Sequence, residues 1–441
     1  MIKCRENHTF ENWAKTLTFK PQSFCQPKTE QDVVDIVKAA RAAGTCVRVQ
    51  GAERSHSWSQ FTVTRDTLVN LDKLNKPLIA DVLKKRYTVQ AGIRLKDLVK
   101  VLALVNLGLR NTGSILEQSI AGAISTGTHG TGLRLGNLAT QIVRMRIVTG
   151  TGAIKEITEN DMPLLNAARV NFGALGIVTE VTVQCVENYN LEFSAYWCKF
   201  EDIIDKIETL NAENERVRIW WFPKPLFGIK HDVVLTTMNP PNTPRGMLDQ
   251  FTDLTAEESN SLSESALPLD IGVLFNALLE LAADPNDQVL LSRFTGNYID
   301  VLTLPLIPIL HRECEYAVPV DKAREALLRF RNVLDEGDFN TTLPVEVRFV
   351  AKDDSLLSPA QGRDVCYIGA QTQDNANEVF QRYEPLMKSL GGRPHWGKHF
   401  TMTRDEMRSM YPATFQQFAD LRAQWDPDGV FANSLIHQLF D

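Results

Sequence analysis

The strand-like segment Val345 to Val350 carries the side chains with the clearest potential for chemistry. Apolar and charged residues alternate there, so Glu346 and Arg348 are two positions apart and point to the same face of a strand. In most proteins a carboxylate beside a guanidinium is an ordinary ion pair. The same pair can also orient a hydroxylated substrate and stabilise an alkoxide. The spacing alone leaves both interpretations open.

Two loops rich in glycine, serine and threonine lie in the first third of the chain. One runs from Gly51 to Ser57 and the other from Gly108 to Gly132. Glycine lacks a Cβ, and serine and threonine add short hydroxyl donors, so such loops can bring backbone N–H groups together around an anion. The Rossmann and P-loop fingerprints are both absent. The loops therefore indicate either a pyrophosphate site of another kind or simple turns between strands.

The elements that must position these residues mix helices and strands without a regular βαβ array. Thr29 can cap an amphipathic helix that Gly44 ends, and the aromatic residues become denser after about residue 190. We therefore predict an α+β fold. Strands are expected at 46–49, 68–71, 87–91, 141–149, 176–185, 314–320 and 345–350, and further helices at 95–104, 322–334 and 404–421.

Short motifs in a fixed order run along nearly the whole chain. Each is weak alone, but their order and spacing are strong together. They make the chain resemble the vanillyl-alcohol-oxidase type of flavoprotein and, within it, the sugar-1,4-lactone oxidases, with alditol oxidases as close relatives. The motifs are Asn12-Trp13-Ala14-Lys15, Gly127-Thr128-His129-Gly130, Gly173-Ala174-Leu175-Gly176-Ile177-Val178, Pro344-Val345-Glu346-Val347-Arg348-Phe349, Leu356-Leu357-Ser358-Pro359, Gly391-Gly392-Arg393-Pro394-His395-Trp396-Gly397-Lys398, Met410-Tyr411-Pro412 and Asp426-Pro427-Asp428-Gly429.

The resemblance implies a two-domain FAD-binding fold of the PCMH type. Residues 1–188 would form the FAD domain, and residues 189–395 a substrate domain with an antiparallel sheet. Residues 396–441 would return to the flavin and deliver Lys398.

The resemblance also assigns both loops to FAD. In the family a histidine of the first loop is often joined covalently to the isoalloxazine ring, and His56 is the matching position. Gly51 and His56 are about two residues further apart than in typical relatives. The covalent bond is favoured, and a non-covalently held FAD is the alternative. The implied cofactor contacts are Gly51, Ala52, Arg54, Ser55, His56, Ser57, Ser114, Ser119, Gly122, Ala123, Ile124, Ser125, His129, Ile177 and Val178.

The resemblance gives five residues a place in catalysis. Glu346 would accept hydrogen bonds from substrate hydroxyls, and Arg348 would stabilise the alkoxide. Lys398, if desolvated beside Arg348, would have a lowered pKa and take the hydroxyl proton, although Arg348 is the alternative. Ser114 would hydrogen-bond near the flavin edge. Gly113 matches a position where a small residue accompanies reaction with oxygen, while a turn glycine is the plainer interpretation.

The expected activity is oxidation of a sugar-1,4-lactone at C2, with hydride passing to flavin N5 and oxygen leaving as hydrogen peroxide. Oxidation of a linear polyol is the first alternative, and a dehydrogenase that uses another electron acceptor is the second. A scaffold that only binds a ligand is less favoured, because Glu346, Arg348 and Lys398 are all retained.

Composition narrows the classes of partner and compartment. The 441 residues carry a net charge of -7, which argues against nucleic-acid binding. No run approaches the length of a membrane-spanning helix. Seven scattered cysteines without a C-x-x-C pair argue against disulfides and a structural zinc site, so the cytoplasm is the expected location. His395 and His399 have a spacing suited to a metal on a helix, but Pro394 and Gly397 oppose a helix, so no metal is expected.

Overall fold

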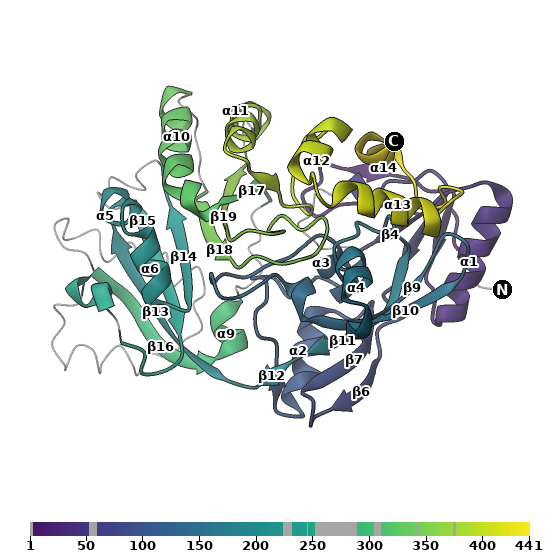
Figure 1. The fold of residues 1–441 in the computed structure, drawn as a ribbon, viewed down its shortest axis with the longest axis horizontal. Coiled ribbons are helices and arrows are strands. Elements are labelled where there is room, and N and C mark those ends of the chain that lie inside the picture. The colour runs from purple at the N-terminus through teal and green to yellow at the C-terminus, as the bar shows by residue number, and fades with distance from the viewer. Residues whose placement is uncertain are drawn as a thin grey trace.

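The computed structural model describes residues 3–52, 60–223, 232–244, 246–251, 289–303, 310–337, 339, 343–373 and 376–441. The chain forms one part around small sheets and a second part around a large sheet (Figure 1). The C-terminal helices, coloured yellow, lie beside α1 and β4 of the first part. They are α12 (Arg404–Met410), α13 (Phe415–Trp425) and α14 (Ser434–Phe440), with α1 at Glu30–Ala43 and β4 at Val47–Gln50.

The first part contains a five-stranded antiparallel sheet and a three-stranded parallel sheet. The larger has the order β10-β9-β11-β7-β6, and the smaller has the order β3-β5-β4. The strands of the larger are β6 (Pro77–Asp81), β7 (Arg86–Gln90), β9 (Ile142–Val148), β10 (Ile154–Thr158) and β11 (Ile177–Gln184). The smaller adds β3 (Ser23–Cys25) and β5 (Thr67–Asn70). Two short pairs are β1 (Phe10–Glu11) with β2 (Thr18–Phe19) and β8 (Leu107–Gly108) with β12 (Val186–Glu187).

The second part is built on an eight-stranded sheet in which every neighbouring pair is antiparallel. Its order is β16-β13-β15-β14-β18-β19-β17-β20. The strands are β13 (Asn190–Cys198), β14 (Arg216–Trp221), β15 (Val233–Asn239), β16 (Val289–Asn297), β17 (Arg312–Pro319), β18 (Val345–Val350), β19 (Val365–Thr372) and β20 (Arg393–Pro394). Helices α5 (Phe200–Ile204), α6 (Ile207–Glu213), α10 (Ala323–Glu336) and α11 (Ala376–Ser389) pack on one face.

Period-two alternation decides which side chains of this sheet face the helices. Val345, Val347 and Phe349 of β18 join the core beneath α10 and α11. Glu346 and Arg348 must therefore point to the opposite face, which is turned toward the first part of the molecule. The sequence pattern thus sends the charged pair toward the glycine-rich loops.

The local sequence explains where several helices of the first part and of the C-terminal segment begin and end. Thr29 caps α1 with a capping box, and Gly44 ends it at a φ of 65°. The single helix expected at 404–421 is instead α12 and α13, because Pro412 lacks the N–H that a continuous helix requires. The other helices are α2 (Leu95–Ala103), α3 (Ile120–Ser125), α4 (Met162–Arg169) and α9 (Tyr298–Leu302).

Arg48 ties β4 to distant segments of the chain. Its buried guanidinium donates to the carbonyl oxygens of Phe61 (2.5 Å), Phe172 (2.8 Å) and Gly173 (3.0 Å), and also to that of Phe431. Burial lowers the pKa of Arg48 to about 10. One side chain therefore holds β4 against the 171–176 loop and against the C-terminal segment.

The cysteine expectation is wrong for one pair. Cys4 and Cys25 form a disulfide across a separation of 21 residues, with their Cα atoms 4.4 Å apart. Spacing along the chain gave no sign of it, because the pairing depends on an isolated bridge between Arg5 and Phe24 that aligns the N-terminal segment with β3. The other five cysteines are free, and four of those are buried. Within the described residues, no helix is both long and apolar enough to cross a bilayer.

Candidate active site

A cavity lies between the glycine-rich loops of the first part and the charged face of the eight-stranded sheet. The empty volume of this cavity is about 1790 Å³, and part of that volume is open to solvent. Fourteen of the expected site residues line it, although they come from widely separated parts of the chain. They are Gly51, Ala52, Gly113, Ser114, Ser119, Gly122, Ala123, Ser125, His129, Ile177, Val178, Glu346, Arg348 and Lys398.

Of the other expected contacts, one lies in the core and four are outside the described residues. Ile124 does not line the cavity, and its side chain is fully buried in the core of the first part. Its position on α3 turns it away while Ala123 and Ser125 remain on the cavity side. Arg54, Ser55, His56 and Ser57 lie outside the described residues.

The two glycine loops approach each other closely, as a cofactor cradle requires. A Cβ on Gly122 would lie 3.6 Å from the Gly51 Cα and 3.2 Å from the Ser119 Oγ. The Ser119 hydroxyl caps α3 by accepting from the Gly122 N–H at 3.3 Å. Side chains at these glycines would fill the space between the loops, so glycine leaves room for a ligand to contact the backbone.

Unpaired polar atoms line the same space. Both side-chain atoms of the Gln50 amide and the Ser114 hydroxyl are buried, and none has a hydrogen-bond partner among the described residues. Gln50 is 3 % exposed. Buried polar atoms are normally paired, so these atoms indicate a ligand rich in hydrogen-bonding groups. Together with the open glycine backbone, they fit the FAD that the resemblance assigns to this position.

The carboxylate of Glu346 lies between two guanidinium groups. Its Oε1 is 3.5 Å from Arg218 Nε and its Oε2 is 3.5 Å from Arg348 Nη2, and these distances give ion pairs without hydrogen bonds. Burial lowers the pKa of Arg218 to about 10, although Glu346 opposes that shift. The carboxylate is thus neutralised while Oε1 remains available to accept a hydrogen bond from a hydroxyl group.

Arg348 makes its main contact with a different carboxylate. Its Nη2 donates to Glu315 Oε1 at 2.7 Å, and its Nη1 donates to the His129 carbonyl oxygen at 3.4 Å. Glu315 is on β17, and β19 lies between it and Arg348. The β19 residue that pairs with both Glu315 and Glu346 is Gly369, which has no side chain. That gap allows groups from non-adjacent strands to meet.

Lys398 has a carboxylate partner of its own. Its ammonium forms an ion pair with Glu313, two residues before Glu315 on the same face of β17. Both side chains are largely buried, with 16 % and 6 % exposed. The expectation of a desolvated Lys398 amine beside Arg348 did not include this carboxylate partner.

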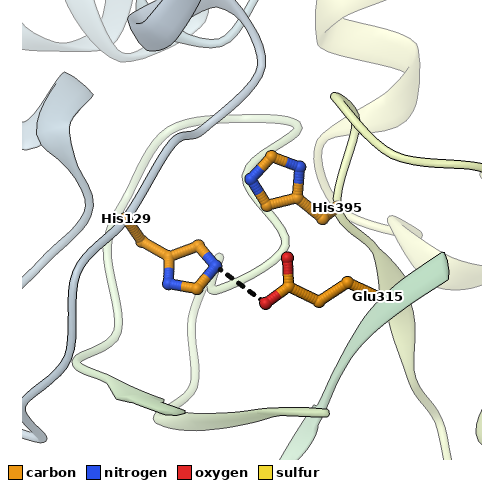
Figure 2. Close-up of side chains that lie close together, drawn as sticks. All are labelled: His129, Glu315 and His395. Atoms are coloured by element: carbon orange, nitrogen blue, oxygen red, sulfur yellow. Dashed lines mark ion pairs between the residues drawn. The ribbon is translucent and has the colours of Figure 1, made fainter. Parts of the chain in front are cut away.

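His129 and His395 lie close to the Glu315 carboxylate (Figure 2). The three side chains are buried, and one potential ligand atom from each lies within 4.8 Å of the others. His129 Nδ1 is 2.9 Å from the Gly130 carbonyl oxygen, which can only accept, so Nδ1 holds the proton. His395 Nδ1 accepts from the Gly397 N–H at 2.9 Å, so its proton is on Nε2.

These tautomers oppose a divalent cation in the cluster. A protonated His395 Nε2 has no lone pair to donate, and Glu315 Oε1 already accepts from Arg348. Burial holds the pKa of His395 well below its ordinary value and also lowers that of His129. Burial alone would raise the pKa of Glu315, but the charge of Arg348 holds it well below its ordinary value. The cluster is therefore two neutral rings around an ionised carboxylate that positions Arg348. His399 instead contacts Glu384, so it does not share a site with His395.

Acidification is expected to destabilise the protein through this cluster. Below about pH 6.5 histidines of the unfolded chain bind protons, whereas His129 and His395 stay neutral in the fold. The unfolded state then binds more protons, so the free energy of unfolding falls by up to about 1.4 kcal/mol per pH unit for each histidine. Below about pH 4.5 Glu315 adds a loss of the same sign, because its folded pKa is lowered.

Urea unfolding of the flavin-loaded protein between pH 8 and pH 5 measures this slope. His129→Gln should flatten it, whereas His437→Gln serves as the control because His437 is 60 % exposed. A wild-type slope no steeper than that of His129→Gln would contradict the assignment of a neutral buried ring.

The sequence interpretation missed several cavity residues. Gln50, Trp220, His311, Glu313 and Gln371 all line the cavity. Glu315, although it does not line the cavity, holds Arg348. One feature of the sequence could have identified the two glutamates. Acids stand at alternate positions of the otherwise apolar strand 313–318, which places two carboxylates on one buried face.

Comparisons with known proteins agree with this architecture. Residues 21–158 match the FAD binding domain family, and residues 181–439 match the D-arabinono-1,4-lactone oxidase family. The L-gulonolactone oxidase of Mus musculus is 32% identical, with 98% of each chain covered. The L-gulono-1,4-lactone dehydrogenase of Mycobacterium tuberculosis is 30% identical, also with 98% of each chain covered.

A solved structure with the same fold is a cholesterol oxidase from B. sterolicum. Its TM-score is 0.78 at 18% identity, and the match covers 100% of this chain and 98% of that one. This likeness confirms the FAD-binding fold expected from the motifs. The family match covers more than half of the chain, and the relatives extend over nearly all of it. The chain therefore belongs to the D-arabinono-1,4-lactone oxidase family of FAD-dependent oxidoreductases.

Proposed function

We propose that this enzyme oxidises the C2 alcohol of a sugar-1,4-lactone of the L-gulono, L-galactono or D-arabinono type. The supporting observation is the convergence of Glu346, Arg348 and Lys398 on one wall of a cavity whose opposite wall is the glycine-rich cradle. When bound, FAD supplies the acceptor for the hydride from C2, and its reoxidation by molecular oxygen yields hydrogen peroxide. The lactone loses its C2 hydrogen and its hydroxyl proton and becomes a 2-keto-lactone.

The protein groups have separate tasks in this proposal. The free Oε1 of Glu346 accepts a hydrogen bond from a substrate hydroxyl and fixes the orientation of the ring. Arg348, held in place by Glu315, provides positive charge for the developing alkoxide. The Lys398 ammonium provides a second positive charge, and its partner Glu313 lines the cavity as the acceptor for the hydroxyl proton. The Ser114 hydroxyl, buried and without a hydrogen-bond partner in the part of the chain that the structure describes, contacts the cofactor.

A substrate panel tests the proposal. Purified protein should oxidise the three lactones and form one equivalent of peroxide for each turnover. Xylitol at equal concentration is the discriminating alternative, because the segment Arg393 to Lys398 also matches alditol oxidases. Faster turnover of xylitol would replace the lactone assignment with a polyol oxidase. Protein that binds FAD but oxidises neither class of substrate would refute both.

Covalent attachment of FAD through His56 is part of the proposal. Acid precipitation should leave the flavin in the protein pellet, because acid releases only flavin that is held non-covalently. His56→Ala should move the flavin absorbance to the supernatant, and His8→Ala is the control for loss of a histidine elsewhere. A colourless wild-type pellet with a yellow supernatant would show that FAD is bound without the covalent bond.

Reaction with oxygen should depend on the space beside Gly113. A Cβ there would lie 2.9 Å from the Thr128 Cγ2 and 3.5 Å from the His129 carbonyl oxygen. Gly113→Ala must therefore push the Thr128 methyl, which lines the same cavity. Peroxide formation should fall by about tenfold or more, while reduction of an artificial dye stays within about threefold.

Thr128→Ser supplies a control for that effect. It removes the colliding Cγ2 and keeps the hydroxyl that contacts Gln118, so Gly113→Ala/Thr128→Ser should recover peroxide formation. Equal loss of peroxide formation and dye reduction in Gly113→Ala would instead indicate general damage to the site. The dehydrogenase assignment is favoured if the wild type reduces dyes but forms no peroxide.

We also propose the cytoplasm as the location, on the basis of the five free cysteines. The Cys4–Cys25 disulfide is an observation against it. Thiol titration of the denatured protein, taken directly from cells in the presence of a trapping agent, distinguishes the two. Seven free thiols would support a reducing compartment, and five would oppose it.

A further inference from the structure

The hairpin formed by β6 and β7 exposes an unusual run of apolar residues. Leu78 is 42 % exposed, Ile79 66 %, Val82 50 % and Leu83 98 %. Pro77 and Ala80 beside them are also exposed, so the run from 77 to 80 is apolar throughout. Single exposed apolar side chains are common, but a consecutive exposed run marks an interaction surface.

Basic side chains surround this apolar run. The residues from Lys73 to Arg86 include five basic side chains and one acidic side chain, in a chain with a net charge of -7. Lys84 follows Leu83 at the tip and is 70 % exposed, with Asp81 at 3.9 Å. Lys85 and Arg86 are paired with Glu187 and Glu159. Lys73 and Lys76 are exposed at the opposite end of β6. With Asp81, Glu187 and Glu159 set against the five basic side chains, the hairpin keeps a small excess of positive charge on an acidic protein.

One more exposed apolar residue, outside the hairpin, belongs to the same rim. Leu104 at the end of α2 is 85 % exposed, and β8 follows within three residues. β12 links this segment to the hairpin tip, because Glu187 pairs with Leu107 of β8 and also contacts Lys85. Figure 1 shows β6, α2 and β12 together along the lower edge of the molecule. No residue from 72 to 112 lines the cavity, so this rim is separate from the active site.

We propose that this hairpin tip docks the protein on an anionic lipid bilayer. Apolar side chains that lie beside lysines match the two layers of a membrane interface, since the former enter the acyl boundary and the latter contact acidic headgroups. A second copy of the chain is a weaker candidate for the same surface. β6 is an edge strand of the sheet, but Pro77, the irregular register that follows it and the neighbouring lysines all oppose edge-to-edge pairing of strands.

Vesicle sedimentation with the flavin-loaded enzyme tests the proposal. The protein should pellet with vesicles of phosphatidylcholine that contain about 30% phosphatidylserine, and less so at about 0.5 M salt. Val82→Ser/Leu83→Ser should lower the partition coefficient by about tenfold or more. Lys84→Glu should weaken binding to the anionic vesicles and leave binding to pure phosphatidylcholine unchanged.

Ile154→Ser provides the matched control. Ile154 is 40 % exposed on β10, the opposite edge strand of the same sheet, so its loss should leave vesicle binding unchanged. Flavin absorbance and lactone turnover in solution should be unaltered in every variant, which separates this surface from the proposed activity. No pelleting of the wild type, or equal pelleting of the double variant, would overturn the proposal. The proposal would also be overturned if the wild type sediments as a dimer and does not bind vesicles, and the double variant sediments as a monomer.

Discussion

Arg348→Lys should lower kcat by about two to three orders of magnitude while FAD content stays unchanged. The guanidinium reaches Glu315, Glu346 and the His129 carbonyl oxygen from one position. A lysine ammonium is a compact point charge on a flexible stem, so it can satisfy only part of this set. The charge would be retained, but its position at the developing alkoxide would be lost. The glycine-rich loops lie on the opposite wall, so cofactor binding should not respond.

The rate of flavin bleaching by substrate in stopped flow isolates the reductive step. Arg216→Lys is the matched control, because Arg216 is also buried and also paired with a glutamate, but it does not line the cavity. Glu315→Gln should give a smaller loss, about tenfold, since Arg348 would keep its charge and lose its anchor. A reductive rate for Arg348→Lys within about threefold of the wild type would refute the role of this guanidinium.

Lys398→Ala should reduce kcat by about three orders of magnitude without loss of FAD. The substitution removes the positive charge beside the reacting hydroxyl and leaves the Glu313 carboxylate buried without its partner. A buried carboxylate that has lost its cationic partner is harder to ionise. The pH profile of kcat/KM should therefore fall off on its acid side at a higher pH than that of the wild type.

Two further variants distinguish charge from proton transfer. Glu313→Gln keeps the Lys398 ammonium and removes the carboxylate that accepts the proton. A loss of kcat as large as that of Lys398→Ala would assign the hydroxyl proton to Glu313. A small loss of kcat would show that Lys398 acts through its charge. A small amine such as ethylamine should partly restore the kcat of Lys398→Ala. Lys388→Ala is the control, because Lys388 forms a similar ion pair with Glu406 and is 17 % exposed. Activity of Lys398→Ala equal to that of this control would refute the role of Lys398.

Patterns within short segments were sufficient for much of the fold. The Thr29 capping box and Gly44 define α1, and alternation in the 345–350 segment defines β18 and the face that carries Glu346 and Arg348. Such features depend on neighbours within a few residues. The break between α12 and α13 was also readable from Pro412, although helical spacing continued across it.

Contacts between distant segments were not readable in the same way. In the sequence, Glu313 and Glu315 resemble ordinary strand residues. In the folded sheet, Gly369 of β19 lies between them and β18, and because it has no side chain Glu315 can contact Arg348. The Lys398–Glu313 pair joins residues 85 positions apart, so no local pattern shows that this amine has a carboxylate partner. The Cys4–Cys25 disulfide likewise needed the N-terminal segment to be aligned with β3.

The amino-acid sequence by itself determined the family, the cofactor and the three charged residues at the cavity, because motif order and local periodicity are properties of the linear chain. Only the tertiary structure decided which partner each charge has, where the two histidines hold their protons, and that a basic apolar hairpin remains uncovered. Electrostatic energies and exposure depend on distances between groups that the chain brings together from far apart, and no spacing along the sequence specifies those distances.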